Sequence, residues 1–256
     1  MFFSSLLFIC AASANASPGE GNSKTLLFLR NHYSAESGFT LLRVKPLNEF
    51  GKGDMRLSCR PGMYLGYKYH INLNDHFALR VGTLTGLHSF RYDFDPHVGD
   101  SAIYTAVKMS VVKPYLTIPV EMNVRIRFQQ RHVIGLVAGI SVNLFGAEKL
   151  TAVTSLSNNP QGNEIYKLDL VYNRANPFVN FEVGLEYLWV LGSMDMLKFA
   201  IKYSAGIRPM FHAQYEHREN DFVLSSGSFN SLNDHLSLGI GYVFTRVNKL
   251  VDQAKN

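Results

Sequence analysis

The sequence has little cysteine, little charge and no long hydrophobic run, and each shortage excludes a class of protein. Two cysteines in 256 residues are too few for a disulfide framework. No run of 18 or more apolar residues exists, so no transmembrane helix is expected. Charged residues make up 18% and hydrophobic residues 46%, a balance that argues against intrinsic disorder.

The sequence also lacks the marks of nucleic-acid binding and of common catalytic sites. The net charge is +5, but the basic residues are scattered along the chain, so no nucleic-acid partner is predicted. Zinc-protease (H-E-x-x-H), phosphate-binding-loop and G-x-S-x-G motifs are all missing from the sequence. We therefore predict no catalytic residue, no metal site and no cofactor, and a protein that is not an enzyme.

The N-terminus has the composition of an export signal. Residues 1–16 are apolar and then small, and Ala14 and Ala16 form an A-x-A cleavage site, so residues 1–16 are predicted to be removed. A buried N-terminal segment is the alternative. A lipid anchor on Cys10 is disfavoured by the large isoleucine that precedes it. Cleavage leaves Cys59 as a lone thiol.

Period-two alternation is the strongest pattern in the chain. In residues 115–128, YLTIPVEMNVRIRF, one face is apolar from Leu116 to Phe128, whereas the other carries Glu121, Arg125 and Arg127. Successive strand side chains point to opposite sides, so this segment is predicted to be a strand. Its 14 residues exceed a typical globular strand and suit a tilted membrane strand. The same alternation recurs in residues 38–45, 62–71, 76–92, 132–144, 178–189, 198–208 and 235–244.

Short and long connections alternate between these eight segments. The long ones cover residues 46–60, 93–112, 146–175 and 212–234. Outer-membrane barrels join their strands by short periplasmic turns and longer external loops. We therefore predict an all-β protein, an eight-stranded up-and-down antiparallel transmembrane β-barrel with long external loops. It is expected to cover residues 38–246, after an N-terminal segment 17–37 and before a polar C-terminal tail 247–256.

The polar strand faces are predicted to point into the barrel, and the apolar faces toward outer-membrane lipid. Glycines are interspersed with charges on the polar faces, which is unfavourable on a solvated strand but useful inside a narrow barrel. Both signs of charge occur, so pairing can offset the cost of burial. The predicted lumen ion-pair cluster is Lys68, Arg80, Glu121, Arg125, Glu182, Glu186, Lys202 and Arg208.

Two further features belong to the predicted strands. Pro119 lies in the middle of a strand and cannot donate to the ladder, so a local bulge or a missing bond is expected there. Aromatic residues near the strand ends suit interfacial girdles. They are Tyr67, Tyr69, Tyr187, Trp189, Tyr242 and Phe244.

Residues 61–94 and 115–128 resemble the PorT-like outer-membrane barrels of the Bacteroidota. The matching features are Pro61-Gly62, Leu79-Arg80 and the segment Tyr115–Pro119. The resemblance implies an outer-membrane location in a Gram-negative bacterium and a role in protein secretion. Partners among other envelope or secretion proteins are therefore expected.

Two other functions remain open at this point. An outer-membrane hydrolase acting on lipid or peptide needs Ser, His and an acid at the barrel rim, where His88 and Ser89 are candidates. A soluble lipocalin-like barrel would instead turn its apolar faces inward around a ligand. His212, Glu216 and His217 lie at the predicted base of a loop and are interpreted as a surface cluster rather than a metal site.

Overall fold

The computed structural model describes residues 31–50, 55–94, 107–129, 131–145, 149–156, 164–172, 177–191, 195–219 and 222–244. Within these ranges every regular element is a strand, and no helix is long and apolar enough to cross a membrane. The predicted export signal, Cys10 and the C-terminal tail lie outside the described residues. The strands are β1 (His32–Leu42), β2 (Lys45–Phe50), β3 (Met55–Asn72), β4 (Phe77–Phe94), β5 (Val107–Gln129), β6 (His132–Phe145), β7 (Lys149–Leu156), β8 (Glu164–Tyr172), β9 (Phe178–Val190), β10 (Met196–Gly206), β11 (Phe211–Glu219), β12 (Phe222–Ser231) and β13 (His235–Phe244).

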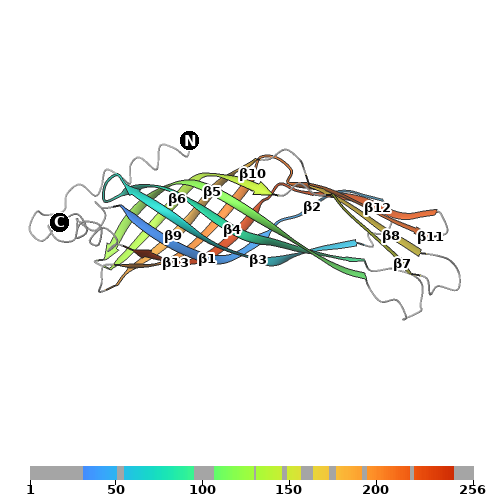
Figure 1. Ribbon diagram of the computed structural model, residues 1–256, viewed down its shortest axis with the longest axis horizontal. Helices are drawn as coiled ribbons and strands as arrows, with labels where there is room; N and C mark the ends of the chain where they lie inside the picture. Colours follow the sequence, from blue (N-terminus) through green and yellow to red (C-terminus); the bar gives the residue numbers. More distant parts are fainter. Residues whose placement is uncertain are drawn as a thin grey trace, which may run out of the picture.

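Eight of these strands form a closed antiparallel barrel, which confirms the predicted fold class (Figure 1). The order is β1-β13-β10-β9-β6-β5-β4-β3, and β3 pairs with β1 to close the ring. One boundary was wrong. The barrel begins at His32 rather than at residue 38, because residues 32–37 pair with both β13 and β3.

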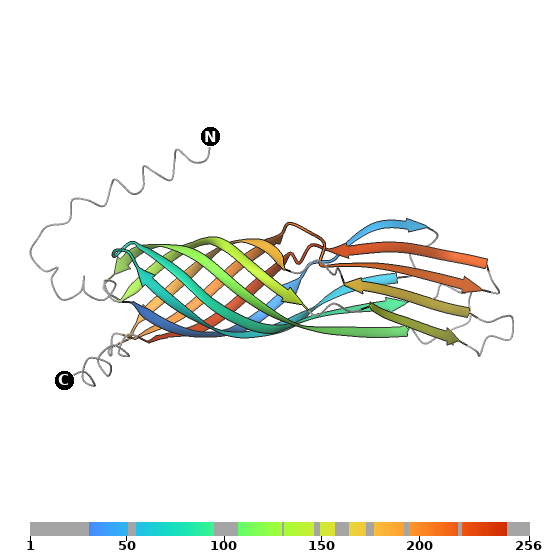
Figure 2. The ribbon, with the colours of Figure 1, turned by 45° about the horizontal axis from the view of Figure 1, so that its top comes forward.

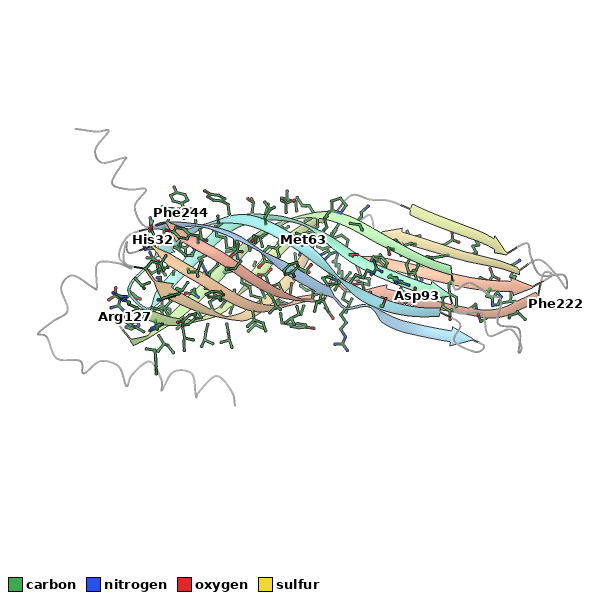
Figure 3. The ribbon with its side chains drawn as sticks, turned by 90° about the horizontal axis from the view of Figure 1, so that it is seen from below. His32, Met63, Asp93, Arg127, Phe222 and Phe244 are labelled. Atoms are coloured by element: carbon green, nitrogen blue, oxygen red, sulfur yellow. The ribbon has the colours of Figure 1, made fainter. Side chains whose placement is uncertain are left out.

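The apolar strand faces point outward, as predicted. On β5, Leu116, Met122 and Ile126 are exposed, whereas Glu121 and Arg125 on the alternate face are buried. Figure 3 shows side chains projecting from the barrel wall all round its length. A soluble lipocalin-like barrel requires the opposite arrangement, so that alternative is wrong.

The predicted long loops contain further strands, which corrects that part of the fold prediction. β2, β12, β11, β8 and β7 form a second, five-stranded sheet in that order. Figure 2 shows this sheet beyond one end of the barrel, beside the outer ends of β3, β4 and β5. The alternation is present there: Phe211, Ala213 and Tyr215 are buried between exposed polar neighbours.

An aromatic core joins the external sheet to the outer end of β4. The rings of Phe90 and Phe211 stack with centroids 4.9 Å apart, and the Tyr92 and Phe229 centroids lie 6.4 Å apart. Both β4 residues are fully buried, and burial raises the pKa of the Tyr92 hydroxyl. The external part of the chain is therefore packed as two layers.

The short connections lie at the opposite end of the barrel, together with the start of β1 and the end of β13. In the β3–β4 turn, the Asn74 side chain accepts bonds from the backbone N–H groups of His76 and Phe77, each 2.8 Å. Aromatic pairs surround this end, with Tyr33 and Tyr69 centroids 4.9 Å apart. Short turns identify the periplasmic end, so the five-stranded sheet faces the cell exterior.

Pro119 interrupts the β4–β5 ladder without producing a bulge. The register is the same on both sides, but the pairs Gly82–Pro119 and Thr83–Ile118 are missing from it. On its other side Pro119 pairs with Ser141 of β6. Of the two outcomes expected from the sequence, the missing bond is therefore the one observed.

The outward orientation of the apolar rows predicts how a charge on β13 will act. Ile240 is exposed near the middle of that strand, so Ile240→Arg should lower the free energy of unfolding by about 2–4 kcal/mol. Urea titration of the chain in lipid vesicles measures this. Gln214→Arg, at an exposed position of the external sheet, is the matched control and should change little. Equal tolerance of both substitutions would contradict the membrane orientation.

Candidate functional site

A continuous network of ion pairs crosses the barrel interior. Lys68 Nζ lies 2.8 Å from Glu36 Oε1 and 2.7 Å from Glu121 Oε1. Lys202 Nζ lies 2.6 Å from the same Glu121 oxygen, and Lys198 pairs with Glu36. The network therefore links strands β1, β3, β5 and β10 across the lumen.

The network extends to β4 and β9 through Arg80. Its Nη1 lies 2.7 and 2.8 Å from the two carboxylate oxygens of Glu186, and its Nε lies 3.5 Å from Glu121 Oε2. Asn123 Nδ2 also donates to Glu186 Oε2 at 3.3 Å. A buried carboxylate is stable only when it is paired and hydrogen-bonded, and Glu186 meets both conditions.

Glycines on neighbouring strands make room for the lysine stems. A Cβ at Gly82 would lie 2.7 Å from Cγ of Lys68, and a Cβ at Gly184 would lie 2.7 Å from Cγ of Lys202. Both distances are below van der Waals contact. The inward glycines noted in the sequence thus have a packing role, because each leaves space for a charged side chain from the next strand.

The interior is filled rather than open. Arg80, Lys68 and Lys198 are among the largest fully buried side chains, although a water-filled channel would expose them. A cavity of about 20 Å³ lies next to the network, lined in part by Thr40 and Glu182. That volume is close to the space for one water molecule, so the described side chains fill the lumen at the level of the network.

Five of the eight residues predicted for the lumen cluster take part directly in the network. They are Lys68, Arg80, Glu121, Glu186 and Lys202. Arg125 is buried nearer the periplasmic end, where its Nη2 donates to Asn72 Oδ1 at 2.5 Å. Glu182 lines the small cavity and acts electrostatically on Lys202. Arg208 was assigned wrongly: β10 ends at Gly206, and Arg208 is exposed in the connection that follows.

Two network residues were absent from the predicted cluster. Glu36 lies on β1, in the part of the strand that the sequence did not predict, between outward positions occupied by the small residues Ala35 and Ser37. Lys198 has the same parity as Lys202 on β10 and is fully buried. The strand periodicity alone was sufficient to place Lys198 inside.

An aromatic layer lies between the network and the external sheet. His88 is fully buried and stacks on Tyr115, with centroids 4.2 Å apart and planes at 14°. The rings of His235 and Phe145 lie 5.3 and 5.9 Å from His88. Neither His88 nitrogen has a hydrogen-bond partner among the described residues. His88 is therefore a packing residue here, and no Ser–His–acid arrangement surrounds it in this part of the structure.

His212 and His217 do not form a joint site. They lie on β11 rather than in a loop, and an odd separation puts them on opposite faces. His212 is exposed and His217 is buried. No group of three or more potential metal-ligating residues occurs among the described residues.

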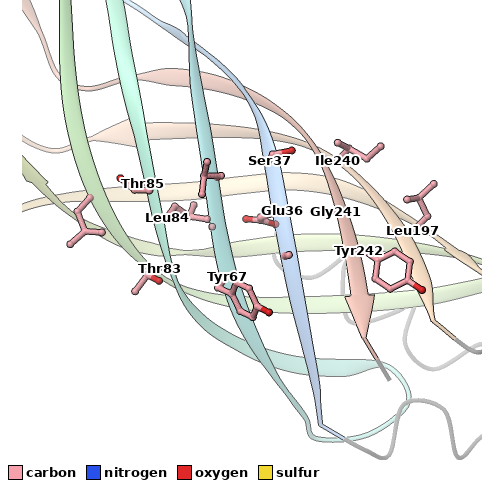
Figure 4. Close-up of a pocket in the computed structure, with 14 residues that line it drawn as sticks. Glu36, Ser37, Tyr67, Thr83, Leu84, Thr85, Leu197, Ile240, Gly241 and Tyr242 are labelled. Carbon is pink, nitrogen blue, oxygen red and sulfur yellow. The ribbon is translucent and has the colours of Figure 1, made fainter. Parts of the chain in front are cut away.

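A groove of about 670 Å³ lies on the outer wall of the barrel (Figure 4). Its lining comes from β10, β13, β1, β3, β4 and β5, and the small Ala35 of β1 pairs with Tyr67 on one side and with Tyr242 on the other. Its lining is largely apolar and it lies at the level of the exposed hydrophobic rows. It is part of the lipid-facing surface.

A closed barrel with an apolar exterior, a charged and filled interior and an aromatic girdle defines an outer-membrane protein. The chain belongs to the outer membrane protein beta-barrel domain family, whose model matches residues 15–251. That family places it in the outer membrane of a Gram-negative bacterium. The search of curated proteins found no match.

Solved structures with similarity to the chain are also outer-membrane proteins. OprG from Pseudomonas aeruginosa is 12% identical, with 84% of this chain and 96% of that chain covered and a TM-score of 0.49. AlkL in lipid bilayers is 16% identical, with 90% and 96% covered and a TM-score of 0.39. Ail from Yersinia pestis, in a crystal structure, is 12% identical, with 84% and 99% covered and a TM-score of 0.32. These scores are below 0.5, so the family assignment rests on the family model.

Removing the carboxylate at the centre of the network should destabilise the barrel. Glu121→Gln leaves Lys68 and Lys202 without their shared partner, so we expect the free energy of unfolding to fall by about 3–5 kcal/mol. Urea titration in lipid vesicles measures the change. Glu216→Gln, which removes an exposed ion pair with Arg218, is the control and should cost at most about 1 kcal/mol. Similar effects of the two substitutions would argue against a buried network.

His88→Phe should leave stability unchanged or raise it, because the imidazole nitrogens are buried without partners and the ring is stacked among aromatic rings. His88→Asp should destabilise the barrel, since it puts a carboxylate into the same layer. Heat-modifiable gel migration and urea titration compare the two variants. A loss of more than about 2 kcal/mol in His88→Phe would show that the ring nitrogens hold a bond.

Proposed function

We propose that this protein is a non-enzymatic outer-membrane barrel that acts through its external sheet, as an accessory of envelope assembly or protein secretion. The observation that carries the proposal is the buried ion-pair network. Because Lys68, Arg80 and Glu121 fill the lumen with fully buried side chains, transport through the barrel is disfavoured. The interior acts as a structural plug, and the function is assigned to surfaces outside the lumen.

The external sheet supports the second half of the proposal. It is an ordered two-layer structure with its own aromatic core, and it lies beyond the membrane-spanning part (Figure 2). At its far end Phe222, Val223 and Leu224 are exposed in succession, and Figure 3 shows Phe222 at the tip. Runs of exposed apolar residues are typical of interaction surfaces. A packed sheet beyond the membrane-spanning part suits recognition of another protein.

The link to secretion rests on the resemblance of residues 61–94 and 115–128 to PorT-like barrels. Export by the signal in residues 1–16 belongs to the same proposal. The partners are other envelope or secretion proteins, and the surrounding ligand is outer-membrane lipid. No cofactor, metal or nucleic acid takes part.

The plugged lumen predicts that the reconstituted protein does not conduct ions. Planar-bilayer recordings of the refolded chain should give the same current as protein-free bilayers. A variant in which Lys68, Glu121 and Lys202 are all replaced by Ala removes the crossing side chains and should conduct if it folds. Stable conductance steps from the wild-type protein would overturn the closed-lumen proposal.

Partner binding is tested by affinity capture from crosslinked outer membranes. The tagged protein should enrich the same envelope proteins in repeated experiments, relative to an unrelated eight-stranded barrel expressed at the same level. Enrichment of no protein above that control would contradict an accessory role.

A further inference from the structure

The external sheet ends on both sides in strands that have one unpaired edge. Its order is β2-β12-β11-β8-β7, and within the described residues β2 pairs only with β12 and β7 only with β8. Each terminal strand therefore presents a row of backbone N–H and C=O groups outward. Such a row is a template for one more strand.

The two edges differ in how well they are protected. Proteins block exposed edges with proline and with charged side chains, lysine above all. β2 is short and contains Lys45, Pro46 and Glu49 within its six residues. β7 has a single charge, Lys149, at its first residue, and residues 150–156, LTAVTSL, contain neither charge nor proline. Its threonines and valine also favour extended structure.

Other strands also extend beyond the pairing on one of their sides, and the outer part of β5 carries protective residues. β5 pairs with β4 from Val107 onward, but its pairing with β6 begins only at Tyr115. This outer part of β5, residues 107–114, contains Lys108, Lys113 and Pro114. β3 likewise pairs with β4 from Met55 but with β1 only from Pro61, and its residues 55–60 contain Arg56 and Arg60. β12 pairs with β11 from Phe222 but with β2 only from Ser226, and its four residues 222–225 are uncharged. Among these strands, β7 has the longest stretch without charge or proline.

We propose that the outer edge of β7 is a docking site where an extended segment of a partner protein adds to the external sheet as a sixth strand. This inference rests on the proposed function, since it needs a partner outside the membrane. An extended polypeptide is the chemical group that matches a row of alternating donors and acceptors. Residues 150–156 carry no charge in the sequence, so the matching segment is one rich in apolar and β-branched residues.

A second copy in the same membrane fits this edge less well. β6 ends at Phe145, at the outer end of the barrel, and β7 starts at Lys149, so β7 runs away from the membrane. A two-fold axis along the membrane normal would relate two such strands in parallel. Antiparallel pairing is the more stable per residue and needs a strand that runs toward the membrane. A segment of a different protein can approach in that direction.

The test uses a peptide with the sequence of β8, residues 164–172, EIYKLDLVY, which is already the complement of β7. Two N-methylated versions are compared with it, one modified at residues 165, 167, 169 and 171 and the other at residues 166, 168 and 170. A strand added at an edge uses only alternate N–H groups. We therefore expect the unmodified peptide to bind, one version to lose at least about tenfold in affinity, and the other to bind nearly unchanged.

Substitutions in the two terminal strands of the sheet show where the peptide binds. Val153→Lys puts a charge in the middle of β7 and should weaken peptide binding at least about tenfold. Leu47→Lys, the same substitution type on β2, is the matched control and should have no effect. Both variants are first checked for folding by heat-modifiable migration. Lack of binding, equal loss in both N-methylated versions, or a larger effect of Leu47→Lys would each overturn the proposal.

Failure of this inference differs from failure of the proposed function. If envelope proteins are captured equally by the wild type and by Val153→Lys, the accessory role is supported and the β7 docking site is contradicted. If only one of the two N-methylated peptides loses affinity but the wild type captures no envelope protein, the edge binds extended peptides and the accessory role is contradicted.

Discussion

Each charge enclosed by this barrel must find an opposite charge inside it, and the rest of the structure depends on that constraint. Moving an ion out of water costs several kcal/mol, which only close pairs and hydrogen bonds offset. Glu121 meets this condition by contacting Lys68, Lys202 and Arg80 from three other strands. The strands can hold these contacts only in one register. The same contacts fill the lumen at the level of the network, so one set of side chains both fixes the register and occupies the interior.

Most of the barrel could be predicted from the sequence because lipid imposes a strict rule on its strands. Every outward position of β5 from Leu116 to Phe128 is apolar, and the inward row is polar or proline apart from Tyr115, so the alternation is unambiguous. β1 was predicted too short for the same reason. Ala35 and Ser37 occupy outward positions, so the difference in hydrophobicity between the two faces is small there. The sequence therefore did not predict this part of β1, which contains Glu36. Lys198 is a different case. It lies four residues before Lys202 on the same face of β10, so the alternation alone predicts that it points inward.

The external sheet was harder to predict because a strand face in contact with water tolerates both polar and apolar residues. A strand such as β8 needs only one buried row, here Leu168 and Leu170, and its outward row can be of any polarity. Long connections are also what an outer-membrane barrel leads one to expect, so short alternating segments within them carried little weight. Ion pairing could be expected from the sequence, but the particular partners could not, because they depend on side chains that meet across the lumen rather than on adjacent strands. Glu36 and Lys198 are one such pair.

A barrel with a filled interior has three surfaces left for recognition: the lipid-facing wall, the periplasmic turns and the exterior. The wall is largely apolar and suits lipid. The described turns are short; that between β3 and β4 is held by the Asn74 side chain. The exterior instead carries strands on long connections, stabilised by an aromatic core that the barrel does not need for closure. Ordering these residues costs conformational entropy, about 1–2 kcal/mol for each backbone residue. A surface that is ordered at such a cost, and that keeps an unprotected strand edge, is best explained by binding at that surface.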